Sequence, residues 1–418
     1  MGFTFIHAAD LHLDSPFHLP GAQQGHVGEA LADATFAAFD NLAALCLERK
    51  PLFLAVAGDV YDESDRGVRA QLRFLDGLRR LADADIQSFI VHGNHDPLER
   101  WSHRLSWPDA VHIFSTEAPE TCVIEANGAP AAAVTGMSYA TRRVNENLAA
   151  RFQAAHPDLF QVALLHCNCG GNTAHADYAP CAPAELAGAG FDYWALGHVH
   201  TRDVLNTRPH VVYPGNPQGR HVNEPGARGC YVVEVDDHNR VAEMTFVPLD
   251  VVRWAQRSVA VDGLDTIDLL ADTLADALES LRAEHEGRHV VCRFRLEGRG
   301  PLYETLRNTA ETDALLEELR RTGSNSEPLV WVERLDVGCG PAIDLEAQRQ
   351  EQDLLAVLLE EADRLRDAPD LKEALAPAFA ELHAQAATQD IGAPNPEEVE
   401  ALLDEAVYLC ASLLRGRI

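Results

Sequence analysis

The sequence lacks several features that mark common classes of protein. No run of about 18 apolar residues occurs in the chain, so we expect no membrane-spanning helix and no membrane partner. The N-terminal residues contain no basic segment ahead of an apolar run, so they do not resemble a secretory signal peptide. The nine cysteines include no Cys-x-x-Cys pair, which is typical of reduced thiols rather than of a zinc site. Together these absences predict a cytoplasmic protein.

Positive charge is scarce as well. Lys and Arg number 34 against 65 Asp and Glu, which gives a formal net charge of −31 at pH 7, and only Lys50 and Lys372 are lysines. Proteins that hold nucleic acid by bulk positive charge have the opposite balance. The composition therefore predicts weak intrinsic affinity for nucleic acid, whatever the chain acts on.

Histidine content and periodicity divide the chain near residue 250. Of the 19 histidines, 16 precede this point, which suggests a metal or acid–base site in the first part. That part alternates β-branched or aromatic runs with helical patterns, which is typical of βαβ units around a buried sheet, so we expect an α/β fold. The expected strands cover 4–9, 52–57, 86–92, 161–165, 192–196, 211–213, 230–235 and 243–248, with helices over 29–49 and 69–84.

The rest of the chain predicts a small α/β domain followed by helices. The expected strands here are 253–261, 289–296 and 329–337, and the expected helices are 266–286, 311–321 and 344–366. A final helix should begin at Pro396, with Asn395 as its N-cap. Its apolar stripe, from Val399 to Leu414, packs on its own domain in one interpretation and in the groove of a partner in the other.

Five polar motifs directly follow the C-terminal ends of five expected strands. In open α/β sheets the ligand crevice lies outside the carboxyl ends of the strands, so these loops are expected to converge. One such motif would indicate only a turn, but five in series indicate a site. The motifs are Asp10-Leu11-His12, Gly58-Asp59-Val60-Tyr61-Asp62, Gly93-Asn94-His95-Asp96, His166 and Gly197-His198-Val199-His200.

The motifs supply nitrogen and oxygen ligands for divalent metal ions. Such donors suit manganese, iron or zinc, and manganese is our first choice. Seven side chains exceed the needs of one ion, so we expect two ions about 3.5–4 Å apart, bridged by Asp59 and sharing a hydroxide that attacks phosphorus. The predicted ligands are Asp10, His12, Asp59, Asn94, His166, His198 and His200. His95, paired with Asp96, is expected to protonate the leaving oxygen.

These motifs resemble those of the calcineurin-like metallophosphoesterases over residues 4–250. Segments 6–17, 91–96, 195–200 and 213–218 are similar to the DNA repair exonuclease branch, which contains SbcD-like, manganese-dependent nuclease subunits. The resemblance implies a four-layer metallophosphoesterase domain with central mixed sheets. We expect that domain over residues 1–250, a small α/β capping domain over 251–340, and a helical tail over 341–418 that docks an ATPase.

The resemblance also implies roles for single residues and for partners. One ion would be held by Asp10, His12, Asp59 and His200, and the other by Asp59, Asn94, His166 and His198. His95 would be the general acid, and Asp62 occupies a position that the family ties to exonuclease activity. The implied partners are DNA, a coiled-coil SbcC-like ATPase subunit and a second copy of the chain in a homodimer. Loop arginines such as Arg220 could contact phosphates, but such residues are usually solvated, so we assign them no role.

The leading hypothesis is a two-metal phosphodiesterase that acts on DNA as an exonuclease, and on single strands also as an endonuclease, in DNA repair. One alternative is a phosphoesterase of small nucleotides or phospholipid precursors. A second is a non-catalytic scaffold subunit of an ATPase complex. A protein Ser/Thr phosphatase fits less well, because Asp65-Arg66-Gly67 comes three residues later than the matching motif of those enzymes.

Overall fold

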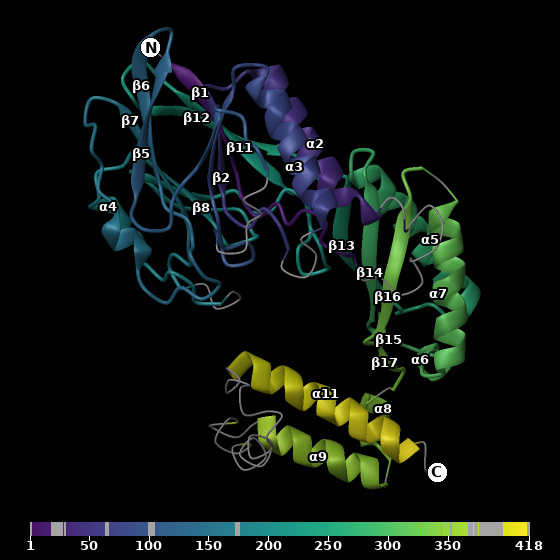
Figure 1. Ribbon diagram of the computed structural model, residues 1–418. Coiled ribbons are helices and arrows are strands. Elements are labelled where there is room, and N and C mark those ends of the chain that lie inside the picture. The colour runs from purple at the N-terminus through teal and green to yellow at the C-terminus, as the bar shows by residue number, and fades with distance from the viewer. Residues whose placement is uncertain are drawn as a thin grey trace. The chain divides into compact units, whose positions relative to one another are not determined.

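Two compact units make up the chain. The computed structural model (Figure 1) describes residues 2–17, 28, 31–62, 67–98, 105–171, 176–325, 327–343, 345–351, 353–366, 371, 375 and 396–415. One unit comprises Met1–Gln256, Glu279–Cys292 and Gly323–Glu333, and the other comprises Arg257–Leu278, Arg293–Thr322 and Arg334–Ile418. The domain boundaries expected at residues 250 and 340 stay predictions. Asp65, Arg66 and Asn395 lie outside the described residues.

Two six-stranded mixed sheets form the first part of the chain, which confirms the predicted α/β fold. The first sheet has the order β12-β11-β1-β2-β3-β4, and the second has the order β5-β6-β7-β8-β10-β9. The strands of the first sheet are β1 (Phe3–Ala8), β2 (Phe53–Ala57), β3 (Gln87–Val91), β4 (Val111–Ile113), β11 (Gly229–Val235) and β12 (Val241–Pro248). Those of the second are β5 (Glu120–Ala126), β6 (Ala129–Gly136), β7 (Phe160–His166), β8 (Tyr193–Gly197), β9 (Asp203–Thr207) and β10 (His210–Tyr213).

Parallel pairing runs through the middle of both sheets. Strands β1, β2, β3 and β4 are parallel, as are β6, β7, β8 and β10. Antiparallel pairing adds β11 and then β12 beside β1 in the first sheet, and it adds β5 and β9 at the two edges of the second. Parallel strands end at the same side of their sheet, so their C-terminal loops are neighbours in each sheet.

The two faces of each central strand serve different cores. In β1, Ile6 packs under the helices, whereas Phe5 packs between the sheets against Phe53 and Phe160. Strands buried on both faces read as nearly continuous apolar runs, which explains why they were recognisable in the sequence.

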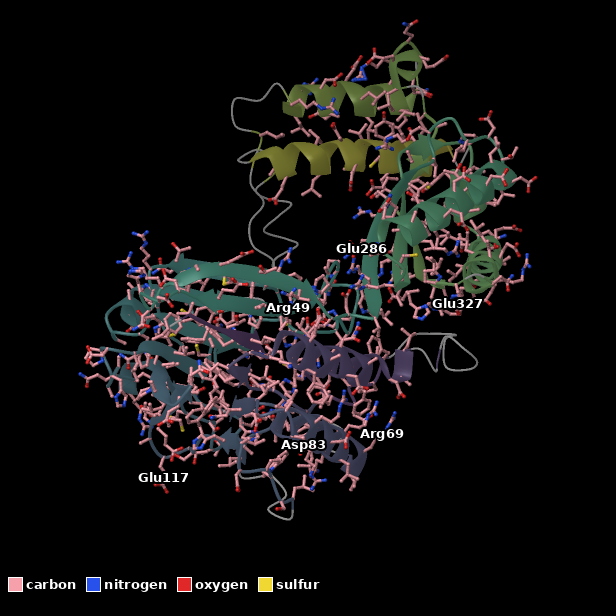
Figure 2. The ribbon with its side chains drawn as sticks, turned by 90° about the horizontal axis from the view of Figure 1, so that it is seen from above. Arg49, Arg69, Asp83, Glu117, Glu286 and Glu327 are labelled. Carbon is pink, nitrogen blue, oxygen red and sulfur yellow. The ribbon has the colours of Figure 1, made fainter. Side chains whose placement is uncertain are left out.

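Helices and loops complete a four-layer sandwich. Helices α2 (Ala34–Arg49) and α3 (Val68–Ala82) cover the outer face of the first sheet, on the side away from β5, β6 and β7 (Figure 1). Arg69 and Asp83 mark the two ends of α3 in Figure 2. The short helices η2 (Leu148–Arg151) and α4 (Pro183–Ala187) contribute to the core outside the second sheet.

A smaller three-stranded sheet follows, close to its predicted bounds. Its order is β13-β14-β16, with strands β13 (Val252–Ala260), β14 (His289–Glu297) and β16 (Val330–Val337). Its helices are α5 (Ile267–Glu284), α6 (Tyr303–Leu306) and α7 (Thr309–Ser324). The short strands β15 (Arg299–Gly300) and β17 (Gly340–Pro341) form a separate parallel pair.

The tail contains helices α8 (Leu345–Arg349), α9 (Leu354–Arg366) and α11 (Pro396–Arg415). Figure 1 shows α9 and α11 side by side, and Leu359 of α9 shares a core with Val407 and Ala411 of α11. The Arg299 guanidinium lies 3.1 Å from the ring centroid of Tyr408. The stripe thus packs partly on its own unit. Among the described helices, none combines the length and apolarity of a membrane span.

The buried His7 side chain predicts a particular response to acid. His7 lies in β1 with no solvent exposure, and its Nδ1 lies 3.1 Å from the Tyr193 hydroxyl. Burial lowers the pKa of His7 from 6.5 to about 3. Below pH 6.5 the unfolded chain binds a proton that the folded chain excludes, so stability falls as the pH is lowered towards 3.

We therefore expect His7→Gln to flatten the pH dependence of stability. Between pH 6.5 and 5 the variant should lose roughly 1.5 kcal/mol less of its free energy of unfolding than the unmodified chain. Urea titrations at both pH values measure this difference. His238→Gln, at an exposed histidine, is the control. Equal losses in His7→Gln and the unmodified chain would show that His7 is not held neutral.

Candidate metal centre

The predicted polar loops converge at one side of the sandwich. Loop residues after β1 continue the pairing with the loop after β2, because the backbone N–H groups of Asp10 and His12 donate to the carbonyls of Gly58 and Asp59, both at 3.0 Å. The second sheet contributes His166 at the end of β7, and its Nδ1 lies 2.9 Å from the Ala57 carbonyl of β2. The ends of β1, β2 and β7 are thus joined by hydrogen bonds.

The backbone at this point is strained. Asp10, His12, Asp59 and His198 have φ values of 53°, 42°, 50° and 104°, in the left-handed region that side chains with a Cβ rarely adopt. Strain of this kind persists where the surrounding structure imposes it, and it concentrates at functional sites. The unusual conformation of four predicted ligands therefore supports a functional centre.

Asp59 lies at the middle of the cluster. Its Oδ2 lies 3.3 Å from His166 Nε2 and 3.9 Å from His12 Nε2, and its Oδ1 accepts the His95 N–H at 2.9 Å. Asn94 Oδ1 lies 3.1 Å from the same His166 Nε2. Neighbouring histidines hold the pKa of Asp59 well below its usual value, although burial opposes them.

The imidazole of His166 shows that a cation fits here. Its Nδ1 donates to a backbone carbonyl, so the neutral ring presents a lone pair at Nε2 to the oxygens of Asp59 and Asn94. Three acceptors facing one another require a positive charge among them. Burial by itself would lower the pKa of His166, but the Asp59 carboxylate outweighs burial and raises the pKa to about 9. The oxygens of Asp59 and Asn94 and the Nε2 atom of His166 thus surround a position that suits a positive charge, such as a metal ion.

A second group of ligands repeats this arrangement. His12 Nε2 and His200 Nε2 lie 3.1 Å apart, and His200 Nδ1 is 2.6 Å from Glu224 Oε1. A carboxylate only accepts, so Nδ1 of His200 carries a proton, and Nε2 is the nitrogen that faces His12 and could bind a metal. Burial lowers the pKa of His12 well below its usual value, so the His12 ring is neutral.

Asp10 belongs to both groups. The ligand atoms of Asp10, His12 and His200 lie within 4.8 Å of one another, and so do those of Asp10, Asp59 and His166. Burial raises the pKa of Asp10 to about 6, although its carboxylate accepts the backbone N–H of His198. The two groups therefore share Asp10, whereas the sequence predicts a bridge through Asp59. The ligand roles themselves stay predictions.

His198 and Asn94 lie at the margin of these groups. The Nε2 atom of His198 is 2.8 Å from the Ala176 carbonyl, and its ring meets that of His166 edge-on with centroids 5.2 Å apart. This leaves Nδ1 as the atom of His198 that can bind an ion. Asn94 contributes its oxygen beside His166, as described above.

The predicted pairing of His95 with Asp96 is wrong. His95 Nδ1 lies 3.3 Å from Asp62 Oδ1. The Asp96 carboxylate, which is fully buried, instead accepts the backbone N–H groups of Val60 and Gly93, both at 2.8 Å. Through these two hydrogen bonds, the Asp96 carboxylate connects the loop after β2 to the loop after β3. Asp62 is therefore the carboxylate that orients His95.

Asp62 raises the pKa of His95 against the opposing effect of burial. The contact with His95, together with the hydrogen bonds from Ser15 and Arg220, lowers the pKa of Asp62 although burial would raise it. Asp62 and His95 also form a group with His12 whose ligand atoms lie within 4.8 Å of one another. His95 therefore lies at the edge of the cluster beside an ionised carboxylate.

A loop after β10 contributes residues that sequence reasoning missed. Glu224 orients His200, and Asn216 donates to Glu224 Oε2 at 2.8 Å. Arg228 donates to the His200 carbonyl and to Asn216 Oδ1. Arg220 lies beside Asp62 rather than in solvent. Segment 213–218 carried part of the family resemblance, which was the available signal that this loop serves the site.

Carboxylates and imidazoles clustered at the strand ends of a double-sheet sandwich define a metal-dependent hydrolase. The family described as calcineurin-like phosphoesterase matches residues 3–202, and the middle domain of metallophosphoesterase YhaO matches residues 254–340. An uncharacterized metallophosphoesterase, YhaO of Bacillus subtilis (strain 168), is 35% identical over 338 residues, which cover 80% of this chain and 81% of that protein. The chain therefore belongs to the calcineurin-like metallophosphoesterases, which confirms the predicted family.

Two more distant relatives are called DNA double-strand break repair protein Mre11. The protein of Aeropyrum pernix is 26% identical over 241 residues, 53% of this chain and 56% of that protein. The protein of Saccharolobus solfataricus is 27% identical over 206 residues, 47% of this chain and 49% of that protein. The chain spans about half the length of these two relatives.

Gly93 gives a direct test of how closely the loops must approach. A Cβ at Gly93 would overlap Asp59 Oδ1 and lie 2.8 Å from His166 Nε2. Gly93→Ala should therefore displace both side chains, destabilise the fold by about 1–3 kcal/mol and reduce the metal bound per chain. Elemental analysis after dialysis against manganese measures the metal content. In the control Gly188→Ala, the new Cβ meets its nearest neighbour at 3.8 Å. Full metal content in Gly93→Ala would contradict the proximity of these residues.

Proposed function

We propose that the chain is a two-metal phosphodiesterase that hydrolyses DNA as an exonuclease. The observation that carries the proposal is the pair of ligand groups that share Asp10, with His95 held by Asp62 at their edge. Two divalent ions bound there would supply a hydroxide nucleophile at neutral pH and neutralise charge on the phosphate oxygens. The donors are all nitrogen and oxygen, which favours manganese, with iron or zinc as the other candidates.

The assignment of ligands follows the two groups. We assign Asp10, His12 and His200 to one ion and His166, Asn94 and His198 to the other, with Asp59 between them. Glu224 holds the tautomer of His200, and the Ala57 carbonyl holds that of His166. The rings of His200 and His166 are therefore oriented before any ion binds.

His95 supplies the proton of the reaction. Its Nδ1 faces Asp62, so Nε2 is the nitrogen that transfers a proton to the leaving oxygen. Because Asp62 raises the pKa of His95, the ring keeps that proton to a higher pH than a histidine without such a partner. Asp62 thus has a positioning role in the hydrolysis of the ester bond.

Two observations favour DNA over a small phosphoester. Distant relatives named as DNA double-strand break repair proteins match 53% and 47% of this chain. The chain also continues for more than 150 residues beyond the two large sheets, which suits a large substrate and a protein partner. The net charge of −31 predicts that substrate affinity depends on the metal ions and on a partner.

The central test is replacement of His95. With manganese, the purified chain should degrade end-labelled DNA, and His95→Gln should reduce the rate about 10²- to 10⁴-fold. His238→Gln, which changes an exposed histidine, should keep the full rate. Undiminished cleavage by His95→Gln would remove His95 from the mechanism. Rapid turnover of a small nucleotide diester with no cleavage of DNA would favour the small-molecule alternative.

A coiled-coil ATPase subunit is the partner that we propose for the tail. Leu402, Leu409 and Leu413 of α11 are 47%, 57% and 58% exposed, while Val407 on the same helix is buried against α9. The apolar stripe is thus wider than its own unit can cover. The homodimer and the cytoplasmic location stay predictions.

Charge placed on this exposed face should weaken the complex. We expect Leu402→Asp combined with Leu409→Asp to reduce recovery of a co-expressed ATPase subunit about tenfold. Leu269→Asp on α5 is the control, because Leu269 is also 47% exposed. Nuclease activity without the ATPase should not change. If the ATPase subunit is recovered equally well with the double substitution, or with residues 343–418 deleted, the docking site lies elsewhere.

A further inference from the structure

Arg220 borders two parts of the site at once. Its Nη1 donates to Asp62 Oδ2 at 3.1 Å, and its Nη2 lies 3.4 Å from His200 Nδ1. Asp62 faces His95, and His200 faces His12. The guanidinium therefore lies between the proton donor of the proposed reaction and one group of metal ligands.

One edge of this guanidinium lacks acceptors among the described residues. Nε is buried and has no hydrogen-bond partner. Nη2 faces His200 Nδ1, but that nitrogen donates its own proton to Glu224 and cannot accept another. Nε and Nη2 form the parallel pair of donors with which arginine binds an oxyanion. A buried donor without an acceptor, such as Nε here, requires an explanation, and a ligand oxyanion provides one.

The surrounding residues hold Arg220 in place. Its side chain is only 15% exposed, and its backbone N–H donates to Glu224 Oε2 at 2.7 Å. Asp62, which also accepts from Ser15 Oγ at 2.7 Å, balances the buried positive charge before any substrate arrives. A guanidinium fixed in this way loses little conformational entropy when it binds a ligand.

We propose that Arg220 binds a non-bridging oxygen of the scissile phosphate. This inference rests on the proposed function, and it makes Arg220 a substrate-binding residue of that reaction. Nη1 keeps its bond to Asp62 while the Nε and Nη2 edge receives the phosphate oxygen. Asp62 then positions both the phosphate-binding Arg220 and the proton donor His95, which sets the two groups at a constant separation.

The test combines phosphate binding with catalysis, both on the full chain loaded with manganese. We expect Arg220→Gln to weaken the binding of inorganic phosphate, measured by calorimetry, about 10- to 100-fold, and to reduce kcat/KM for DNA by at least as much. Arg220→Lys keeps the charge but loses the planar fork, so it should recover part of the affinity. Manganese content should equal that of the unmodified chain in both variants.

Arg202→Gln is the matched control, because the exposed Arg202 guanidinium lies 4.1 Å from the ring centroid of Phe246 rather than in the site. Phosphate affinity within twofold of the unmodified chain in both Arg220 variants would overturn the inference. So would an equal loss in Arg202→Gln, or a loss of manganese that parallels the loss of affinity. If the unmodified chain cleaves DNA and Arg220→Gln cleaves it equally well, the inference alone fails. If the unmodified chain cleaves no DNA, the proposed function fails.

Discussion

Two fully buried carboxylates, Asp10 and Asp59, impose the main constraint on this structure. Negative charge inside an apolar sandwich is costly unless protons, hydrogen bonds or metal ions compensate it. Here the compensation comes from the His166 imidazole beside Asp59, whose pKa is raised, and from the backbone N–H groups of the neighbouring loops. Because imidazole lone pairs also face the carboxylates, the cluster is arranged for divalent cations rather than for self-neutralisation.

The rest of the fold holds this cluster together. The loops that follow the C-terminal ends of the parallel strands in both sheets lie on the same side of the sandwich. Hydrogen bonds join the loops after β1 and β2. The left-handed backbone at Asp10, His12 and Asp59 costs stability locally, and the aromatic core between the sheets offsets it. The hydrogen-bonded loops and the packed core hold the predicted ligands and His95 in fixed orientations before substrate binds.

The sequence predicted the fold well because each central strand is an apolar run followed at once by polar residues. The same pattern located Asp10, Asp59 and His166, which the structure brings together. It did not predict the partner of His95, because the choice between Asp62 and Asp96 depends on how two loops approach in space. Glu224 was missed and Arg220 was given no role for a similar reason, since both lie several residues beyond the end of β10. The sequence could not show whether the apolar stripe on α11 packs on its own unit or on a partner, because the same pattern of apolar residues suits both.

The claim that this cluster is a two-metal centre depends most directly on where ions bind. A crystal structure of the full chain soaked in manganese, with anomalous scattering recorded near the manganese edge, would locate them. We expect two peaks about 3.5–4 Å apart, one beside His12 and His200 and the other beside His166 and Asn94, with a carboxylate of Asp59 or Asp10 between them. A single peak, or peaks away from these residues, would contradict this account.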